Sequence, residues 1–373
     1  MLKKLSNYAF YIALTVELLL VILDKSVYII RHDGLIFRFT FVLFLIKVLL
    51  TQYNRKEWAA IGAFALLGAI SYLVTGRNEI LRLVVMIAAF KDVKYDFVIK
   101  YVFYFTLAGC VLLIIRSFFG IGTFSLTRDF GRGEISTRYS LGLGHPNALH
   151  CMFWALSTLY LYIYRNRNKW IGVAVIFAAN IGLFCLTDSR TGLLATLFTI
   201  GLFVIMNIKL SRTVERIIVR LTYVGIILSF VSSALMMSHK FFWTNLRRID
   251  ELLTGRILWT HMDIMEAKTF FWRPFGAMGQ GKPTDLGLVK MFYWYGYIPV
   301  IAFIVISCIL VRTAVREGDR IALVVVASIV FYSIFEGHAI SVFLLRNYIF
   351  VLIGKYWTRM IGVECTESNV TDG

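Results

Sequence analysis

The sequence predicts an all-α, polytopic membrane protein of about twelve transmembrane helices. Three observations lead to this fold class. Of the 373 residues, 59% are hydrophobic and only 16% are charged, and the mean hydropathy is +0.74, which is unlike a soluble domain. Apolar runs of roughly 17 to 23 residues recur along the chain, enough to cross a hydrocarbon core of about 30 Å. A spanning segment must also satisfy its own backbone hydrogen bonds, which favours helices.

The whole chain, residues 1–373, is expected to form one integral membrane domain. The first apolar run follows two lysines and lacks a small-residue cleavage site, so we interpret it as a retained helix and not as a removed signal peptide. The fourth is short and contains Arg82. The expected spans are 5–23, 34–52, 58–75, 79–90, 97–119, 145–164, 169–187, 189–208, 217–237, 286–311, 320–335 and 339–354.

The orientation follows from Lys and Arg in the short connections. One set reads LKK, NRKE, KDVK, RNRNK, KLSRTVER, RTAVREGDR and KYWTR. The alternating set, DKSVYIIRHD, TGRNE, TDSR and EGHA, contains far fewer positive charges. Cytoplasmic loops carry the positive excess, so both termini are predicted to be cytoplasmic. The connection 120–144 and the large extracytoplasmic loop 238–285 then face outward.

Cysteines and charge narrow the chemistry. The five cysteines include no CxxC pair, which excludes a cysteine zinc site and a disulfide framework. The net charge is +17, and both outer loops are basic. These loops either lie solvated near anionic lipid headgroups or bind a phosphate-bearing substrate, because the planar guanidinium of arginine suits phosphate oxygens.

The stretch TDSRTGLLATL contains an arginine between two apolar runs. Asp188 or Ser189 can cap a helix that starts near Arg190. One interpretation is an Asp188–Arg190 ion pair that fixes a tight turn. The other is a cation beside the exposed N–H groups of a helix start, where both bind an anion.

The stretch RYSLGLGHPNALH gathers Arg138, His145 and Asn147 at one helix start, where Pro146 suits the first turn. It is either a simple loop-to-helix junction or part of a site. Within 238–285, residues from Thr254 predict a short amphipathic helix that begins near Arg256.

Further polar residues lie on the same predicted face. Arg273 and Asp285 flank the glycine-rich FGAMGQG, and the alternative for this region is an interfacial lid. FEGHAI places Glu336 and His338 in a short outer turn, either as functional groups or as a satisfied interfacial pair.

These motifs together resemble the O-antigen polymerase and ligase superfamily. SRTGLLATL is followed by TGRILW, then FGAMGQG, then Asp285 and YWYGYIP, in an order and spacing similar to that family. GLGHPNALH further resembles an element of capsule and exopolysaccharide repeat-unit polymerases. The resemblance covers residues 115 to 315. The family's ligases usually carry histidine near the position of Asp285, and this departure favours a polymerase.

The resemblance implies a fold like that of the C-type glycosyltransferases and a location in a bacterial cytoplasmic membrane with the active face outward. It implies transfer of a glycan from a polyprenyl-pyrophosphate-linked donor to a glycan acceptor, with lipid pyrophosphate as leaving group. Membrane lipid and a chain-length regulator protein are the other partners considered; no nucleic acid, cofactor or metal is expected. Substrate-binding candidates are Arg190, Arg256, Arg273, Arg138 and Asn147, and candidate bases are Asp285, His145, Glu336 and His338.

A transporter or flippase of lipid-linked sugars is the alternative from another class, beside an O-antigen-type ligase. Transporters place ionisable residues near the bilayer midplane. Arg38, Lys47 and Arg82 lie within apolar runs and favour this alternative.

Overall fold

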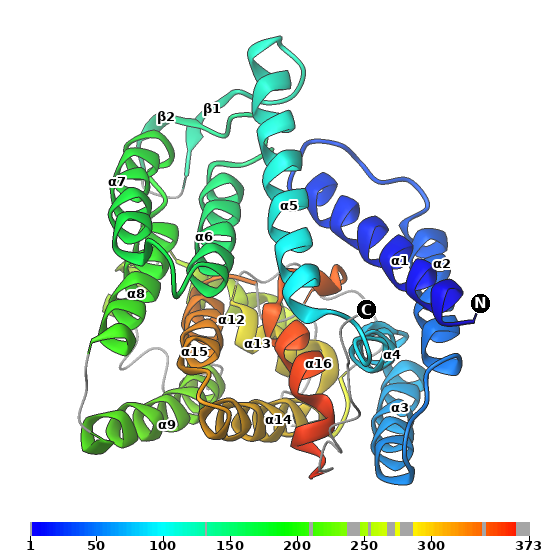
Figure 1. Cartoon of the computed structure of the whole chain (residues 1–373). Coiled ribbons are helices and arrows are strands. Elements are labelled where there is room, and N and C mark those ends of the chain that lie inside the picture. Colours follow the sequence, from blue (N-terminus) through cyan, green and yellow to red (C-terminus); the bar gives the residue numbers. More distant parts are fainter. Residues whose placement is uncertain are drawn as a thin grey trace.

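The structure is a computed structural model, and it describes residues 2–130, 133–208, 212–236, 247–252, 255–266, 273–276, 286–337 and 341–362. It is mostly helical, with 77% helix. Among the described residues there is one two-stranded sheet. Figure 1 shows the sheet at the top of the molecule beside the end of α5, while α9 and α14 lie along the bottom.

Five helices form the first part of the chain: α1 (Leu2–Asp24), α2 (Asp33–Leu49), α3 (Arg55–Thr75), α4 (Glu79–Ala89) and α5 (Tyr95–Phe118). Local sequence explains the bounds of α3. Asn54 and Glu57 form a reciprocal capping box at its start, and Gly76 ends it in the left-handed conformation with φ of 72°. The short α4 contacts α2, α3 and α16, so protein surrounds it.

A β-hairpin and four helices follow: β1 (Ser125–Asp129), β2 (Ile135–Tyr139), α6 (Pro146–Ile163), α7 (Lys169–Thr187), α8 (Arg190–Asn207) and α9 (Arg212–Met236). The hairpin was not expected, because the sequence indicated only a loop over 120–144. The strands pair antiparallel with Thr127 opposite Thr137, and their hydroxyl oxygens lie 2.8 Å apart. The alternation in SLTRD and ISTRY is the local signal for it.

The last part contains α11 (Arg247–Leu252), α12 (Arg256–Glu266), α13 (Gly287–Tyr295), α14 (Tyr297–Arg316), α15 (Arg320–Phe335), a 3₁₀ turn (Leu344–Arg346) and α16 (Tyr348–Met360). The expected helix near Arg256 is confirmed as α12. These helices α11 and α12, with residues 273–276, are what the structure describes of the predicted loop 238–285.

The single helix expected over 286–311 is wrong, because the chain breaks at Gly296 between α13 and α14. Gly296 has φ of 80°, and a Cβ atom there would lie 2.5 Å from the backbone of Phe275. The segment 273–276 fills this break. The N–H of Tyr297 donates to the carbonyl of Arg273 at 2.9 Å, so a loop from elsewhere in the chain replaces a helical hydrogen bond.

The last helix is displaced from the expected range 339–354. It begins after Asn347, whose side chain accepts a hydrogen bond from the N–H of Ile349 at 2.9 Å. It extends to Met360 and so includes the basic KYWTR stretch. Lys355 there bonds to Asp319 at 2.8 Å, and Arg359 pairs with Glu317.

Six described helices are long and apolar enough to cross a membrane: α1, α3, α5, α7, α8 and α14. Their outward faces are apolar and exposed, as Leu73 at 74% and Ile171 at 67% illustrate. Exposed apolar helix faces of this kind are consistent with contact with a membrane. The membrane class is therefore supported, whereas the expected twelve spans are not confirmed. Helices such as α4 and α13 are too short to cross alone, with 11 and 9 residues.

Candidate functional site at the start of helix α8

The turn between α7 and α8 has two residues, Asp188 and Ser189, and Arg190 is the first residue of α8. Asp188 adopts the left-handed conformation with φ of 47°. Ser189 occupies the N-cap position but makes no side-chain cap bond. Its buried hydroxyl has no partner among the described residues. The first N–H groups of α8 thus have no side-chain acceptor at the cap.

Arg190 does not pair with Asp188, so that predicted interpretation is corrected. The Asp188 carboxylate lies 2.9 Å from the Arg138 guanidinium, which is only 7% exposed. Arg138 is on β2, and its guanidinium carbon stands 4.1 Å from the centre of the Phe130 ring. The hairpin supplies the cation that holds the turn. Arg190 stays exposed, and no ion pair or side-chain hydrogen bond joins it to another described residue.

Glu336 and Arg256 meet beside the same helix start. Arg256 Nη1 donates to Glu336 Oε1 at 2.9 Å, and also to the Phe335 carbonyl at 2.5 Å. The hydroxyl of Thr191, the second residue of α8, donates to the same Glu336 oxygen at 3.0 Å. The starts of α8 and α12 and the end of α15 therefore converge. The side chains of Arg256 and Glu336 are 16% and 18% exposed, so this ion pair is mostly shielded from water.

His145 and Asn147 form the cap of α6. Pro146 is the first helical residue, as predicted, and the N–H of Asn147 donates to His145 Nδ1 at 3.1 Å. The His145 ring also meets Phe130 edge-on at 5.9 Å between centres. Since Arg138 lies over that same ring, His145 is linked to the Asp188 turn through Phe130. The junction interpretation accounts for the geometry of His145 and Asn147.

A buried polar network fixes α6, α7 and α8 to one another below this site. His150 is fully buried, with Nδ1 3.0 Å from the Thr187 hydroxyl and Nε2 2.8 Å from Asn180 Oδ1. Gly192 lets α8 approach this ring, because a Cβ atom there would lie 2.5 Å from His150 Cγ. The glycine of the Arg-Thr-Gly motif thus has a packing role that the motif alone did not indicate.

Arg273 lies apart from this convergence, at the junction of α13 and α14. Its side chain is exposed, and among the described contacts none joins it to Arg190 or Arg256. Gly276, three residues later, lies against α13, where a Cβ atom would meet the Trp294 carbonyl. Asp285 and His338, two of the four candidate bases, lie outside the described residues.

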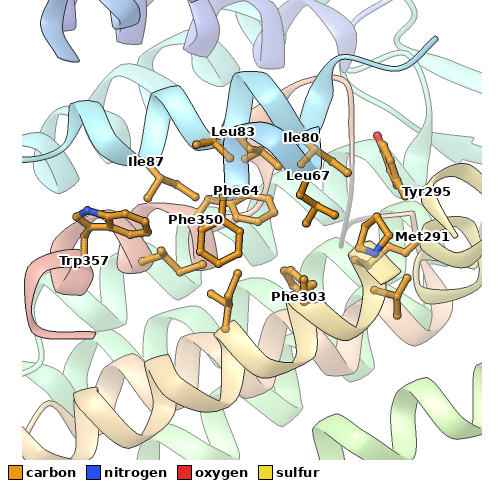
Figure 2. A pocket seen from close by; sticks show the side chains of 16 residues that line it. Phe64, Leu67, Ile80, Leu83, Ile87, Met291, Tyr295, Phe303, Phe350 and Trp357 are labelled. Carbon is orange, nitrogen blue, oxygen red and sulfur yellow. The ribbon is translucent and has the colours of Figure 1, made fainter. Parts of the chain in front are cut away.

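An apolar groove of about 100 Å³ begins beside that junction. Figure 2 shows Tyr295 at one end and Trp357 at the other, with Phe64, Leu83 and Phe303 between them. Cations stand near the Tyr295 end. Arg77 and Lys290 both lie over the ring of the neighbouring Trp294, at 3.8 and 3.9 Å from its centre. The groove is lined almost entirely by apolar side chains.

The three charged residues that favoured a transporter, Arg38, Lys47 and Arg82, lie in different environments. Arg82 is buried and pairs with Glu17 at 3.1 Å, and it donates to the Val342 carbonyl at 3.0 Å. Lys47 is also buried, whereas Arg38 is exposed. Sequence reasoning missed Glu17, although a lone acid within an apolar run indicates a buried partner.

Comparison with protein-family models, with curated proteins and with solved structures finds no match to this chain. Among the described residues, no three His, Cys, Asp or Glu side chains gather in a way that holds a metal ion, and we assign no metal ligand.

Proposed function

We propose that this protein is a polysaccharide polymerase of the bacterial cytoplasmic membrane that joins polyprenyl-pyrophosphate-linked repeat units on the outer face. One observation carries the proposal: Arg138, Arg190 and Arg256 lie around the uncapped start of α8. Among the described residues, Arg138 pairs with Asp188 and Arg256 with Glu336, whereas Arg190 is exposed.

This arrangement suits a pyrophosphate leaving group. When the acceptor hydroxyl attacks the anomeric carbon, the bond to the lipid pyrophosphate breaks and its electron pair stays on the phosphate oxygen. Fixed cations and helix N–H groups stabilise the charge that develops there. Arg138 and Arg256 are held by their acids and so are already positioned, while the forked guanidinium of Arg190 remains to meet phosphate oxygens.

The acceptor hydroxyl loses its proton to a base in this scheme. Glu336 and His145 are the candidate bases that the structure describes. We favour Glu336, because Arg256 and Thr191 both donate to its Oε1 and orient the carboxylate, whereas His145 Nδ1 accepts the N–H of Asn147. Asp285 and His338 stay candidates by their positions in the sequence.

The buried Arg82–Glu17 pair favours a second candidate, a transporter or flippase of lipid-linked sugars. Reconstituted protein with a synthetic polyprenyl-pyrophosphate repeat unit separates the two. The polymerase produces a ladder of longer glycans. Movement of the lipid between leaflets without any ladder would reject the polymerase.

Arg190→Lys is the sharper test within the polymerase scheme. Lysine keeps the charge but loses the two-pronged contact, so we expect the initial rate of chain growth to fall by about tenfold or more. Arg316→Lys is the matched control, because Arg316 is an exposed arginine in the last turn of α14 and makes none of the contacts described at this site. Normal ladders from Arg190→Lys would show that Arg190 takes no part in binding.

A further inference from the structure

A polar cavity, separate from the apolar groove, lies at the C-terminal end of α8, opposite Arg190. It has a volume of about 700 Å³, and three basic connections that are distant in sequence line it. These basic segments are the α6–α7 turn, the α14–α15 turn and the last turns of α16. The end of α8 also lines the cavity. The side chains that can donate hydrogen bonds into it are Arg165, Asn166, Asn207, Arg320, Lys355 and Arg359.

This cavity is separate from the candidate site. Arg190 begins α8 and Asn207 ends it, and α8 has 18 residues. At 1.5 Å per residue the two positions are about 25 Å apart. All three connections belong to the set whose positive charge predicts a cytoplasmic location.

Basic side chains outnumber acids among the lining residues that the structure describes. Four of these residues are cations and two, Glu317 and Asp319, are acids. Each acid already has a cationic partner: Asp319 bonds to Lys355 at 2.8 Å and Glu317 pairs with Arg359. Arg165 uses one donor on the Tyr162 carbonyl at 2.7 Å. A guanidinium has five donors, so most of those on Arg165 remain for a ligand.

The floor of the cavity is held rigidly. Asp319 Oδ2 accepts hydrogen bonds from the hydroxyls of Tyr162 and Tyr356, both at 2.7 Å, and from Lys355. Its other oxygen caps α15 by accepting from the N–H of Ala322 at 3.1 Å. This cluster joins α6, α15 and α16, so the cationic side chains extend from a fixed frame and lose less entropy when they bind a ligand.

We propose that this cavity binds a phosphate-bearing ligand. A rigid, polar cavity lined by guanidinium and amide donors, with most donors of Arg165 unused, has the chemistry that recognises phosphate oxygens. The phosphate belongs either to a small dissolved molecule or to an anionic phospholipid headgroup. The proposal does not depend on the polymerase assignment, because it uses none of the residues around Arg190.

The test uses the full chain in nanodiscs of phosphatidylcholine. Inorganic phosphate is titrated at constant ionic strength and the midpoint of thermal unfolding is followed. In parallel, nanodiscs that contain phosphatidylglycerol are used to measure retained lipid by native mass spectrometry. The cavity variant is Arg165→Gln with Arg320→Gln, and the matched control is Arg312→Gln with Arg316→Gln, which removes two exposed arginines of α14 outside the cavity.

We expect the cavity variant to weaken binding by at least about tenfold and the control to bind as the wild type does. A loss of the phosphate-dependent shift identifies a dissolved phosphate ligand, and a loss of retained phosphatidylglycerol alone identifies a headgroup. Equal losses in both variants overturn the proposal, because they mean general charge attraction. Wild-type protein that binds neither probe overturns it as well. Unfolding midpoints without ligand verify that both variants fold.

Discussion

At the residue scale, small changes of side chain decide the geometry of the candidate site. The turn before α8 is held from outside by Arg138 and from below by His150, and neither contact uses Arg190. The arginine is thus left exposed on a frame that other residues make rigid. The backbone that carries Arg190 is therefore fixed before any ligand binds.

Gly192 shows how tightly this frame is built. Gly192→Ala places a methyl group 2.5 Å from His150 Cγ, and overpacking of this kind costs about 1–3 kcal/mol of folding free energy. We expect a clear fall in the unfolding midpoint. Gly201→Ala is the control within the same helix, since nothing lies within 4 Å of its Cβ position. It should leave the midpoint unchanged or raise it. Equal midpoints for the two variants would contradict the close approach of α8 to α6.

At the element scale, the ends of helices are joined by polar clusters, and Asp319 is the clearest example. It caps α15 and binds groups on α6 and α16. Burial alone would raise the pKa of this carboxyl, but the hydrogen bond and charge of Lys355, with the hydroxyls of Tyr356 and Tyr162, lower the pKa to about 2. The carboxylate therefore stabilises three elements at once.

This lowered pKa has a consequence for stability. The stabilisation by Asp319 is fully present above its ordinary value of 3.8 and is lost as the pH falls to about 2. The difference corresponds to about 2 kcal/mol. Asp319→Asn should lower the unfolding midpoint at pH 7, and its gap from the wild type should close toward pH 2.5. Asp96→Asn, at an exposed position in the first turn of α5, is the control. A gap that stays constant over this pH range would argue against the ion pair.

The elements show what a sequence can predict and what it cannot. Hydropathy located α1, α3, α5, α7 and α8 because each is one long apolar run. The break at Gly296 escaped prediction because its cause is a tertiary contact with a separate segment, residues 273–276, which hydropathy does not reveal. The same holds within the site. Arg256 and Glu336 are 80 positions apart, and only folding reveals that both meet Thr191.

At the scale of the whole molecule, a buried ion pair joins the beginning of the chain to its end. Glu17 on α1 accepts from Arg82 on α4 and from the Thr40 hydroxyl at 2.7 Å, and Arg82 reaches Val342 before α16. The two charges are 1% and 4% exposed, so neither has water to replace its partner.

Removing one partner of this ion pair should lower the folding stability far more than removing both. Arg82→Met leaves Glu17 buried without its cation, which costs about 3–5 kcal/mol, whereas the double variant with Glu17→Leu should recover much of this loss. The unfolding midpoints of the wild type, the two single variants and the double variant, all in one detergent, measure the coupling between the two residues. A transporter that moves its cargo through this pair would lose lipid movement in the double variant despite restored stability. A polymerase would keep chain growth.

Helix α8 spans the distance between the Thr191–Glu336 contact and the cavity at Asn207. A hydrogen-bonded helix hardly compresses along its axis, so the residues at its two ends move together. The Thr191–Glu336 contact and the Asn207 cavity therefore share one stiff element, and a shift of α8 that moves Asn207 also moves Thr191.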